Sequence, residues 1–259
     1  MSLLGRRRNR SEPRVSAANA AVPPGLRVYA FGDVHGRADL LEILDLSIRS
    51  DIEERPIGHA VVIGLGDYVD RGEDSSRVID MLSSDFAAGC ELVTLKGNHE
   101  AMLLSFLDRP VEIGPKWIPM GGWECLRSYG LTLPWQPESA DEFNRIRNDL
   151  ARALPPEHIG FLQALSLSET IGDYFFVHAG VRYGIPLDRQ QERDLLWIRG
   201  GFADRDVPFE KVIVHGHTVV AAPFIGQHRI NLDTGAYATG RLTCMVFEAD
   251  ERGLLEIQA

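Results

Sequence analysis

The sequence predicts an α/β fold on three observations. Short apolar runs with the composition of strands alternate with runs whose apolar residues recur at three- and four-residue spacing, as in helices. Polar side chains fall directly after several of the strand-like runs, where α/β proteins build their sites. The 259 residues are 44% hydrophobic and 25% charged, which is ordinary for a globular chain that buries a sizeable core. We therefore expect one domain over residues 25–259.

Charge and hydropathy narrow the class of partner. A formal net charge of −10 argues against a nucleic-acid partner, because such binding depends on clustered Lys and Arg. No apolar run approaches the roughly 18 residues that a membrane span needs. We therefore expect a soluble protein with neither nucleic acid nor membrane as its partner.

The cysteines and the N-terminus bear on location. Cys90, Cys125 and Cys244 form no CxxC pair and are too scattered for a disulfide framework, so we expect reduced thiols in the cytoplasm. Five arginines lie among the first 14 residues, and no apolar segment of the kind found in a secretory signal follows them. Residues 1–24 are therefore predicted to be a flexible basic tail.

The first half of the chain contains three strands, each followed by a polar segment and then a helix. A strand over Leu26–Phe31 leads into the loop 32–36, and Leu40, Leu41, Leu44 and Ile48 mark the buried face of the next helix. A strand over 60–65 leads into the loop 66–72 and a short helix over 78–82. A strand over 91–96 leads into the segment 97–100 and a helix over 100–107.

The second half is less regular. Residues 110–165 contain Trp117, Trp123, Trp135, several prolines and the pair Gly121-Gly122, and we interpret them as a helical insertion over one side of the site, with helices near 143–150 and 158–165. Strands over 169–171 and 174–177 are joined by the hairpin turn Gly172-Asp173. A helix over 188–198 should carry Arg199. The remaining strands are predicted over 211–214, 219–225, 229–232, 242–248 and 254–258.

Ten polar residues follow the predicted strands and form the candidate site: Asp33, His35, Asp67, Asp70, Arg71, Asn98, His99, His178, His215 and His217. Carboxylates, imidazoles and an amide suit Mn²⁺, Fe or Zn²⁺ better than a metal bound by thiolates. Asp33 and His35 are two residues apart and can both turn to one ion, while Asp67 has two oxygens and could bridge it to a second. Asn98, His178 and His217 would complete the second site.

Any one of these histidines is more often a hydrogen-bonded residue near a strand end than a metal ligand. The joint occurrence of these residues favours metal ligands over unrelated histidines. Five loops carry an acid or histidine together with a glycine that lets the backbone approach an ion or phosphate. A dimetal site is therefore the better interpretation. His215, just ahead of the Gly-His-Thr element, is expected either to support the metal ligands or to lie on the phosphate side, and not to bind metal itself.

Five short motifs, GDVHG, GDYVDRG, GNHE, HAG and HGHT, occur in this order between residues 28 and 218. Together they resemble the phosphoprotein phosphatase family of metallophosphoesterases, and most closely its bacterial and phage-like serine/threonine phosphatases. The resemblance implies an αββα fold, in which a β-sandwich of two mixed sheets is flanked by helices. It also implies two divalent metals, with Mn²⁺ expected and Fe or Zn²⁺ possible. Asp33 and His35 would hold the first metal, Asp67 would bridge, and Asn98, His178 and His217 would hold the second.

The resemblance further implies roles in catalysis. His99 would be the general acid and Asp70 would orient it, while Arg71, Asn98 and Arg199 would hold the substrate phosphate. Arg199 is assigned because Leu-Trp-Ile-Arg resembles the segment that supplies an arginine in bacterial members. The implied reaction is hydrolysis of phosphoserine or phosphothreonine, with phosphotyrosine left open, by direct attack of a hydroxide that bridges the metals. The substrate would be a phosphorylated protein or a small phosphoester.

Two alternatives belong to other classes. A dinucleoside polyphosphate hydrolase of the symmetrical tetraphosphatase kind shares the GDVHG and GNH loops. Those enzymes resemble one another in lacking an acid at the position of Asp70 and in having Asp where this chain has Glu100, so both residues favour the phosphatase. A non-catalytic phosphopeptide-binding scaffold would be expected to have lost a ligand or the acid, and none is missing here.

Overall fold

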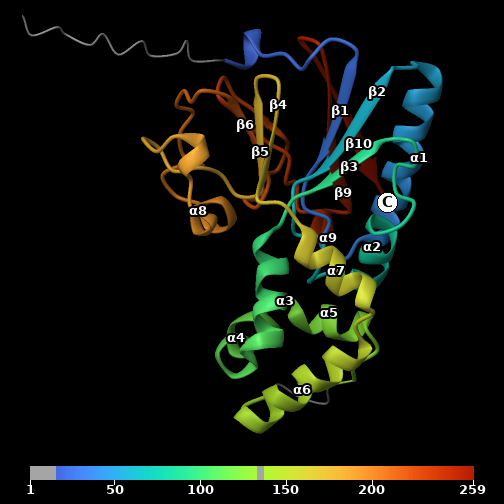
Figure 1. The fold of residues 1–259 in the computed structure, drawn as a ribbon, viewed down its shortest axis with the longest axis vertical. Coiled ribbons are helices and arrows are strands. Elements are labelled where there is room, and N and C mark those ends of the chain that lie inside the picture. Colours follow the sequence, from blue (N-terminus) through green and yellow to red (C-terminus); the bar gives the residue numbers. More distant parts are fainter. Residues whose placement is uncertain (1–15, 133–136) are drawn as a thin grey trace, which may run out of the picture.

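The computed structural model describes residues 16–132 and 137–259, and in it two five-stranded mixed sheets pack face to face between helices (Figure 1). This is the αββα arrangement that the resemblance implied. The first sheet has the order β10-β9-β1-β2-β3 and the second has the order β4-β5-β6-β8-β7. The predicted fold class is therefore confirmed.

The first sheet is parallel on one side and antiparallel on the other. Its parallel strands are β1 (Leu26–Phe31), β2 (His59–Gly64) and β3 (Glu91–Thr94). The C-terminal strands β9 (Arg241–Glu248) and β10 (Glu251–Gln258) pair antiparallel and add β9 beside β1. Residues from both ends of the chain thus build one sheet.

The second sheet has a parallel centre with an antiparallel strand at each edge. The hairpin of β4 (Ser168–Ile171) and β5 (Tyr174–Val177) turns at Gly172-Asp173, as predicted. Parallel pairs then join β5 to β6 (Val212–His215) and β6 to β8 (Arg229–Asn231), and β7 (Phe224–Ile225) closes the edge.

Side-chain alternation along the strands explains why two sheets pack together. In β1, Val28 and Ala30 point into the layer between the sheets, whereas Tyr29 and Phe31 point toward the helices. In β5, Phe176 lies between the sheets and Phe175 lies on the outer face, against the region of α8. A strand buried on both faces has apolar residues in near-continuous runs, as β1 and β5 do.

Helices cover the outer faces (Figure 1). The first sheet is covered by α1 (Ala38–Glu54) and α2 (Ser75–Leu82), and the second by the short α8 (Glu192–Trp197). A helical lobe lies below the sheets and shares its core with α1, α2 and α3 (Asn98–Asp108). The lobe consists of α4 (Pro110–Trp117), α5 (Gly122–Ser128), α6 (Ala140–Ala153) and α7 (Pro156–Ala164).

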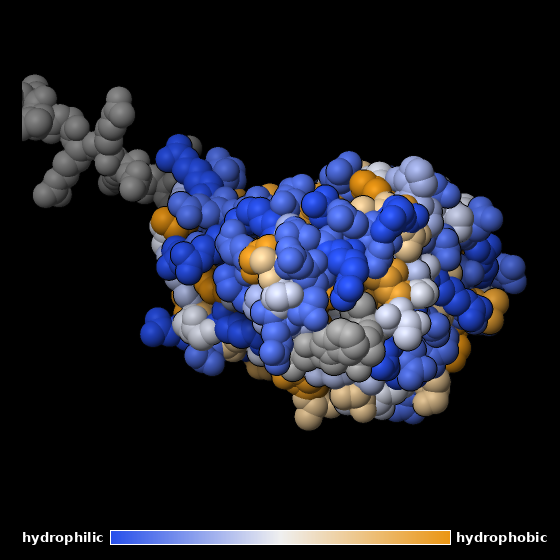
Figure 2. Space-filling model, turned by 90° about the horizontal axis from the view of Figure 1, so that it is seen from below, coloured by the Kyte–Doolittle hydropathy of each residue, from blue (hydrophilic) through white to orange (hydrophobic). Residues whose placement is uncertain are grey.

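Seen from below, from the side of this lobe, the surface is largely hydrophilic with small apolar patches (Figure 2). In the part of the chain that the structure describes, no helix combines the length and apolar character that crossing a bilayer requires.

Four predicted elements need correction. Residues 16–24 are not a free tail: Ala17, Ala20 and Val22 are buried against the second core, and Val22 N–H donates to the carbonyl of Ala249 at 2.9 Å. The arginines of the predicted tail lie outside the described residues, as does Trp135. The predicted helix over 188–198 is a turn of 3₁₀ helix, Leu187–Arg189, followed by α8, because Gln190 donates from its side-chain amide to the carbonyls of Arg182 and Ile185 in the loop.

The other two corrections concern a strand and a helix start. Only the last two residues of the predicted strand 219–225 are paired as β7, since Pro223 has no N–H to give a ladder. The third helix begins at Asn98 rather than at residue 100, because the Glu100 carboxylate accepts the N–H of Gly97 at 2.8 Å and caps the first turn. Asn98 and His99 therefore lie on a helix.

Candidate active site

The predicted ligands lie at the C-terminal ends of strands from both sheets. Asp33 and His35 follow β1, Asp67 follows β2, and Asn98 follows β3; from the second sheet, His178 follows β5 and His217 follows β6. All six are at most 4% exposed. Parallel strands direct their ends to one edge, so residues that are 184 positions apart, Asp33 and His217, come into contact.

The loops that carry these residues are conformationally strained. Five non-glycine residues in them have positive φ: His35 (46°), Asp67 (54°), Asp70 (73°), Arg71 (68°) and His217 (63°). Side chains other than glycine rarely adopt this conformation, and each instance costs about 1–3 kcal/mol. Only two other described non-glycine residues share it, so the strain is concentrated at the site.

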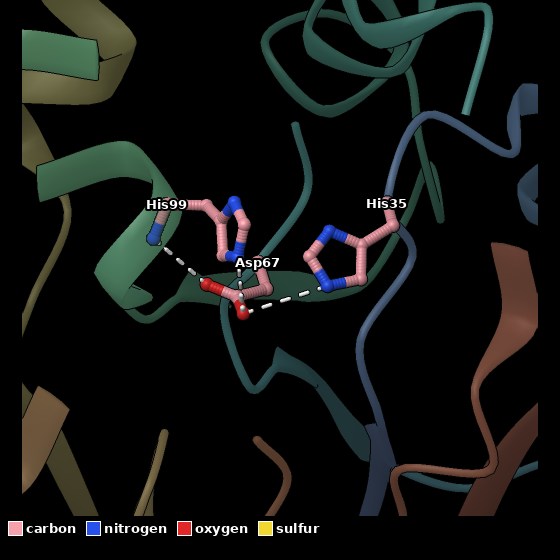
Figure 3. Close-up of side chains that lie close together, drawn as sticks. All are labelled: His35, Asp67 and His99. Atoms are coloured by element: carbon pink, nitrogen blue, oxygen red, sulfur yellow. Dashed lines mark hydrogen bonds and ion pairs between the residues drawn. The ribbon is translucent and has the colours of Figure 1, made fainter. Parts of the chain in front are cut away.

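Asp67 joins a first cluster with His35 and His99 (Figure 3). Its Oδ2 lies 3.6 Å from His35 Nε2 and 3.9 Å from His99 Nε2. His35 donates its Nδ1–H to the carbonyl of Val69 at 2.8 Å, which leaves a lone pair on Nε2. Burial lowers the pKa of His35 to about 3, so the imidazole is neutral and able to bind a metal.

A second cluster forms on the other oxygen of Asp67. His178 Nε2 lies 3.4 Å from Asp67 Oδ1, 3.0 Å from Asn98 Oδ1 and 3.2 Å from His217 Nδ1. His178 donates its Nδ1–H to the carbonyl of Leu65 at 2.9 Å, and burial lowers its pKa. Its Nε2 therefore has a lone pair directed at two oxygen acceptors. The Nε2 atom of His217 is also buried and has no partner.

Asp33 lies beside these clusters without joining either. Its two oxygens accept the backbone N–H of His217 at 3.1 and 3.2 Å, and a Cβ at Gly216 would lie 2.1 Å from its Oδ1. Burial, together with the carboxylates of Asp233 and Asp67, raises the pKa of Asp33 well above its usual range. Gly216 is thus required for this close approach.

The chemistry of the site fits divalent cations. Three buried carboxylates, on Asp33, Asp67 and Asp233, are close enough to affect one another's ionisation, and such a group needs positive charge. In the second cluster, His178 Nε2 lies 3.4 Å from Asp67 Oδ1 and 3.0 Å from Asn98 Oδ1, so one imidazole lone pair and two oxygens converge as a cation requires. The two buried His/Asp clusters are consistent with a dimetal site, and the donor set of imidazole, carboxylate and amide is one that Mn²⁺, Fe and Zn²⁺ all accept.

His99 and Asp70 form a short pair. His99 Nδ1 lies 2.6 Å from Asp70 Oδ2, and both side chains are buried. Since a carboxylate only accepts, His99 carries its proton on Nδ1 and directs Nε2 toward Asp67. Burial by itself would lower the pKa of His99, but the charge of Asp67 and the hydrogen bond that His99 donates to Asp70 raise it above its ordinary value. A histidine held in this way can carry a second proton to a reacting group.

Arg71 connects the two halves of the first cluster. Its Nη1 donates to His35 Nε2 at 2.9 Å and its Nη2 donates to His99 Nε2 at 3.1 Å. The guanidinium also lies 4.9 Å from the ring centre of Tyr237, whose side chain is 39% exposed. Arg71 therefore places positive charge at the mouth of the site.

Arg199 follows α8 on the exposed rim. Its carbonyl accepts the N–H of Phe202 and of Ala203, which fixes its backbone in a turn. Its charge contributes to the lowered pKa of His178 and His217, after burial as the main cause for both. The phosphate-binding role of Arg199 stays a prediction.

His215 does not join the clusters. It lies in β6 with its ring against Phe202 at 5.0 Å between centres, and its Nε2 accepts from Arg229 Nη1 at 3.3 Å. Arg229 also donates to the carbonyls of Ala203 and Arg205. His215 therefore helps to anchor the segment after Arg199, which is a supporting role and not one on the metal side.

Three residues near the site were not assigned by sequence reasoning. Trp117 donates its indole N–H to Asp70, and the Glu100 carboxylate accepts four backbone N–H groups around the Asp67 loop. Asp233 is buried two residues after β8 and accepts the N–H of Gly235 at 2.9 Å. Its position after a predicted strand is the same signal that identified the other carboxylates.

Comparisons with known proteins agree with this geometry. A family model described as calcineurin-like phosphoesterase matches residues 26–250. The asymmetrical bis(5'-nucleosyl)-tetraphosphatase PrpE of Oceanobacillus iheyensis is 25% identical over 249 residues, covering 87% of this chain and 90% of that protein. Serine/threonine-protein phosphatase 2 of Salmonella typhimurium is 22% identical over 225 residues, covering 83% and 90%.

A solved structure shares the fold. The cold-active protein-tyrosine phosphatase of a psychrophilic Shewanella superposes with a TM-score of 0.53 at 17% identity, covering 97% of this chain and 89% of that chain. The family model, the two buried His/Asp clusters and the two-sheet fold thus lead to one conclusion. The chain belongs to the calcineurin-like phosphoesterase family and is a metal-dependent phosphoester hydrolase.

Proposed function

We propose that the chain is a protein phosphatase that hydrolyses phosphoserine and phosphothreonine. The observation that carries the proposal is the buried His99–Asp70 pair, at 2.6 Å. The alkoxide of serine or threonine is a poor leaving group, and an acid that protonates it is worth about 10²- to 10⁴-fold in rate. An enzyme whose substrate has a better leaving group, such as a nucleotide phosphate, depends less on protonation by such a pair.

The residues proposed as ligands are Asp33, His35 and Asp67 for one ion and Asp67, Asn98, His178 and His217 for the other. Bound there, two divalent ions would supply a water of lowered pKa and positive charge for the phosphate oxygens. Mn²⁺ is the ion we expect. All three cysteines are free thiols, in keeping with the cytoplasmic location that we propose.

The remaining residues would bind and protonate the substrate. Arg71 and Arg199 would bind equatorial phosphate oxygens, with Asn98 holding the phosphate as well. Arg71 now donates to the Nε2 atoms of both histidines of the first cluster. When a phosphate binds the Arg71 guanidinium in place of the histidines, His99 Nε2 can carry the proton that the leaving oxygen needs. Asp70 meanwhile keeps His99 Nδ1 protonated.

A second candidate is hydrolysis of dinucleoside polyphosphates, favoured by the similarity to the tetraphosphatase of Oceanobacillus iheyensis. Tyr237, partly exposed beside Arg71, offers an aromatic surface on which a nucleobase could stack. The His99–Asp70 pair is the reason to rank this candidate second.

One comparison of substrates tests both. The chain, loaded with Mn²⁺, is assayed for kcat/KM on a phosphoserine peptide, a phosphothreonine peptide, a phosphotyrosine peptide and a dinucleoside tetraphosphate. The proposal expects the first two to exceed the tetraphosphate. A tetraphosphate preference of 100-fold or more would assign the second candidate, and a preference for the phosphotyrosine peptide of that size would overturn the serine/threonine assignment.

A further inference from the structure

The helical lobe reaches into the active site through one side chain. Trp117, the last residue of α4, donates its indole N–H to Asp70 Oδ2 at 2.8 Å, and the same oxygen is 2.6 Å from His99 Nδ1. Trp117 and Asp70 are both completely buried. The carboxylate is therefore fixed from two sides by donors that point at one oxygen.

The surroundings of the indole leave it no other position. Its ring packs against Phe106 at 4.9 Å between centres. On the other side lies Gly122, where a Cβ would approach two carbons of the indole to 2.7 Å and its Nε1 to 3.0 Å. Any larger residue at 122 would push the indole away from Asp70.

The same segment also fixes Arg71. The N–H of Arg71 donates to the carbonyl of Gly121 at 3.0 Å. A Cβ at Gly121, which has φ of 116°, would lie 2.6 Å from Arg71 Cγ. Gly121 thus leaves room for Arg71, and Gly122 leaves room for the indole that contacts Asp70.

We propose that Trp117 is a positioning residue for the Asp70–His99 pair, and that residues 117–122 of the helical lobe hold the loop of Asp70 and Arg71 in its active conformation. Asp70 and Arg71 both have positive φ, so this loop needs outside contacts to persist. Without the indole N–H, the Asp70 carboxylate can rotate, and His99 loses its fixed orientation toward the leaving group. The lobe then contributes to catalysis through the residues that it positions. This inference rests on the proposed acid role of His99.

The first experiment compares Trp117→Phe with Trp123→Phe, both in the lobe, since the ring of Trp123 packs beside Arg127 and has no described hydrogen bond to Asp70. We expect Trp117→Phe to lower kcat on a phosphoserine peptide by roughly 10- to 100-fold, the range for lost partners of site residues, with KM changed less than about two-fold. On p-nitrophenyl phosphate, whose leaving group needs little protonation, the loss should be several-fold smaller. Trp123→Phe should leave both substrates unaffected.

Gly122→Ala is a second variant that keeps the indole and displaces it, so it should give a loss of the same pattern. A double variant tests the route: Trp117→Phe should change kcat by less than about two-fold when Asp70 is already alanine. Equal losses on both substrates, or an undiminished loss in the Asp70→Ala background, would overturn the inference.

A spectroscopic measurement separates this inference from the proposed function. In the Zn²⁺-loaded protein, the indole N–H resonance of Trp117, assigned by its absence in Trp117→Phe, should move and exchange faster with solvent in Asp70→Ala, while that of Trp123 stays in place. An unmoved Trp117 resonance would show that the contact is not made. If the resonance moves but His99→Asn loses equally on both substrates, the contact stands and the acid role of His99 fails.

Discussion

Glu100 Oε2 accepts the backbone N–H of Asp67 at 2.9 Å, and this hydrogen bond ties α3 to the loop after β2. The carboxylate also accepts from Tyr68, Val69 and Gly97, at 2.7, 3.1 and 2.8 Å, so a completely buried acid satisfies four N–H groups. These donors stabilise the ionised form, although burial raises the pKa of Glu100. Glu100 therefore sets the conformation from which Asp67 faces both clusters.

We predict that Glu100→Gln lowers the free energy of unfolding by about 2–4 kcal/mol, because the new amide must place N–H groups against backbone N–H donors. Urea denaturation of the metal-free chain measures this. Glu112→Gln is the matched control, since Glu112 is exposed and pairs only with Arg109 among the contacts described for it. A variant as stable as the wild type would show that the loop does not depend on the carboxylate.

His99→Asn should keep the metals and lower kcat on a phosphoserine peptide by roughly 10²- to 10⁴-fold, the range expected for a lost general acid. On p-nitrophenyl phosphate the loss should shrink, because that leaving group departs without a proton. Metal content by elemental analysis and kcat on both substrates are the measurements. Equal losses would assign His99 to binding phosphate or metal instead.

Arg199→Ala should leave the fold and metal content intact. It should lower kcat/KM by an amount equivalent to about 2–4 kcal/mol of transition-state stabilisation, and inhibition by inorganic phosphate should weaken in parallel. Arg199→Lys should recover only part of this loss, because an ammonium cannot make the two parallel contacts of a guanidinium. Arg193→Ala, on the exposed face of α8, is the control. Phosphate inhibition that is the same in Arg199→Ala as in the wild type would leave Arg199 a surface residue.

Removal of metal should abolish activity and lower thermal stability. Asp33 and Asp67 are buried beside Asp233, so a bound cation relieves repulsion that the metal-free chain must bear. Exhaustive chelation followed by titration with Mn²⁺ should raise the unfolding free energy by about 2.7 kcal/mol at 100 times the dissociation constant. Full turnover after all metal is removed would contradict the dimetal mechanism.

Asp51 should make stability depend on pH far from the site. Its carboxylate accepts from Tyr29, Arg27 and Arg55; burial opposes its ionisation, but these donors lower its pKa below the ordinary value. A lowered pKa in the folded state adds stability above the unfolded pKa near 3.9, and this stability is lost as the pH falls. Asp51→Asn should therefore cost about 1–2 kcal/mol at pH 7 and much less near pH 3. An equal cost at both values would exclude the charge as the cause.

The sequence predicts the parts of this molecule that depend on local pattern. Apolar runs followed by Gly and Asp or His locate β1 and β2 and place Asp33 and Asp67 at one edge, because side-chain periodicity and strand direction are local properties. The hairpin at Gly172-Asp173 is predictable for the same reason.

Contacts between distant segments are not encoded in this way. Trp117 meets Asp70 across 47 residues, and nothing in the spacing of either segment indicates it. Residues 219–225 have the composition of a strand, yet only Phe224 and Ile225 pair with β8. Asp233 shows the intermediate case, since its place after a predicted strand was visible and its neighbours were not.

The proposed metal ligands extend from residue 33 to residue 217, and the sheet that carries the first of them is completed by β9 and β10, which end at residue 258. During synthesis on a ribosome, Asp33 and His35 emerge long before His178, His217 and the strand that pairs with β1. A nascent chain therefore exposes isolated carboxylates and imidazoles but no cage for an ion. We therefore expect the proposed metal site to form only after the segment that carries His217 has been translated.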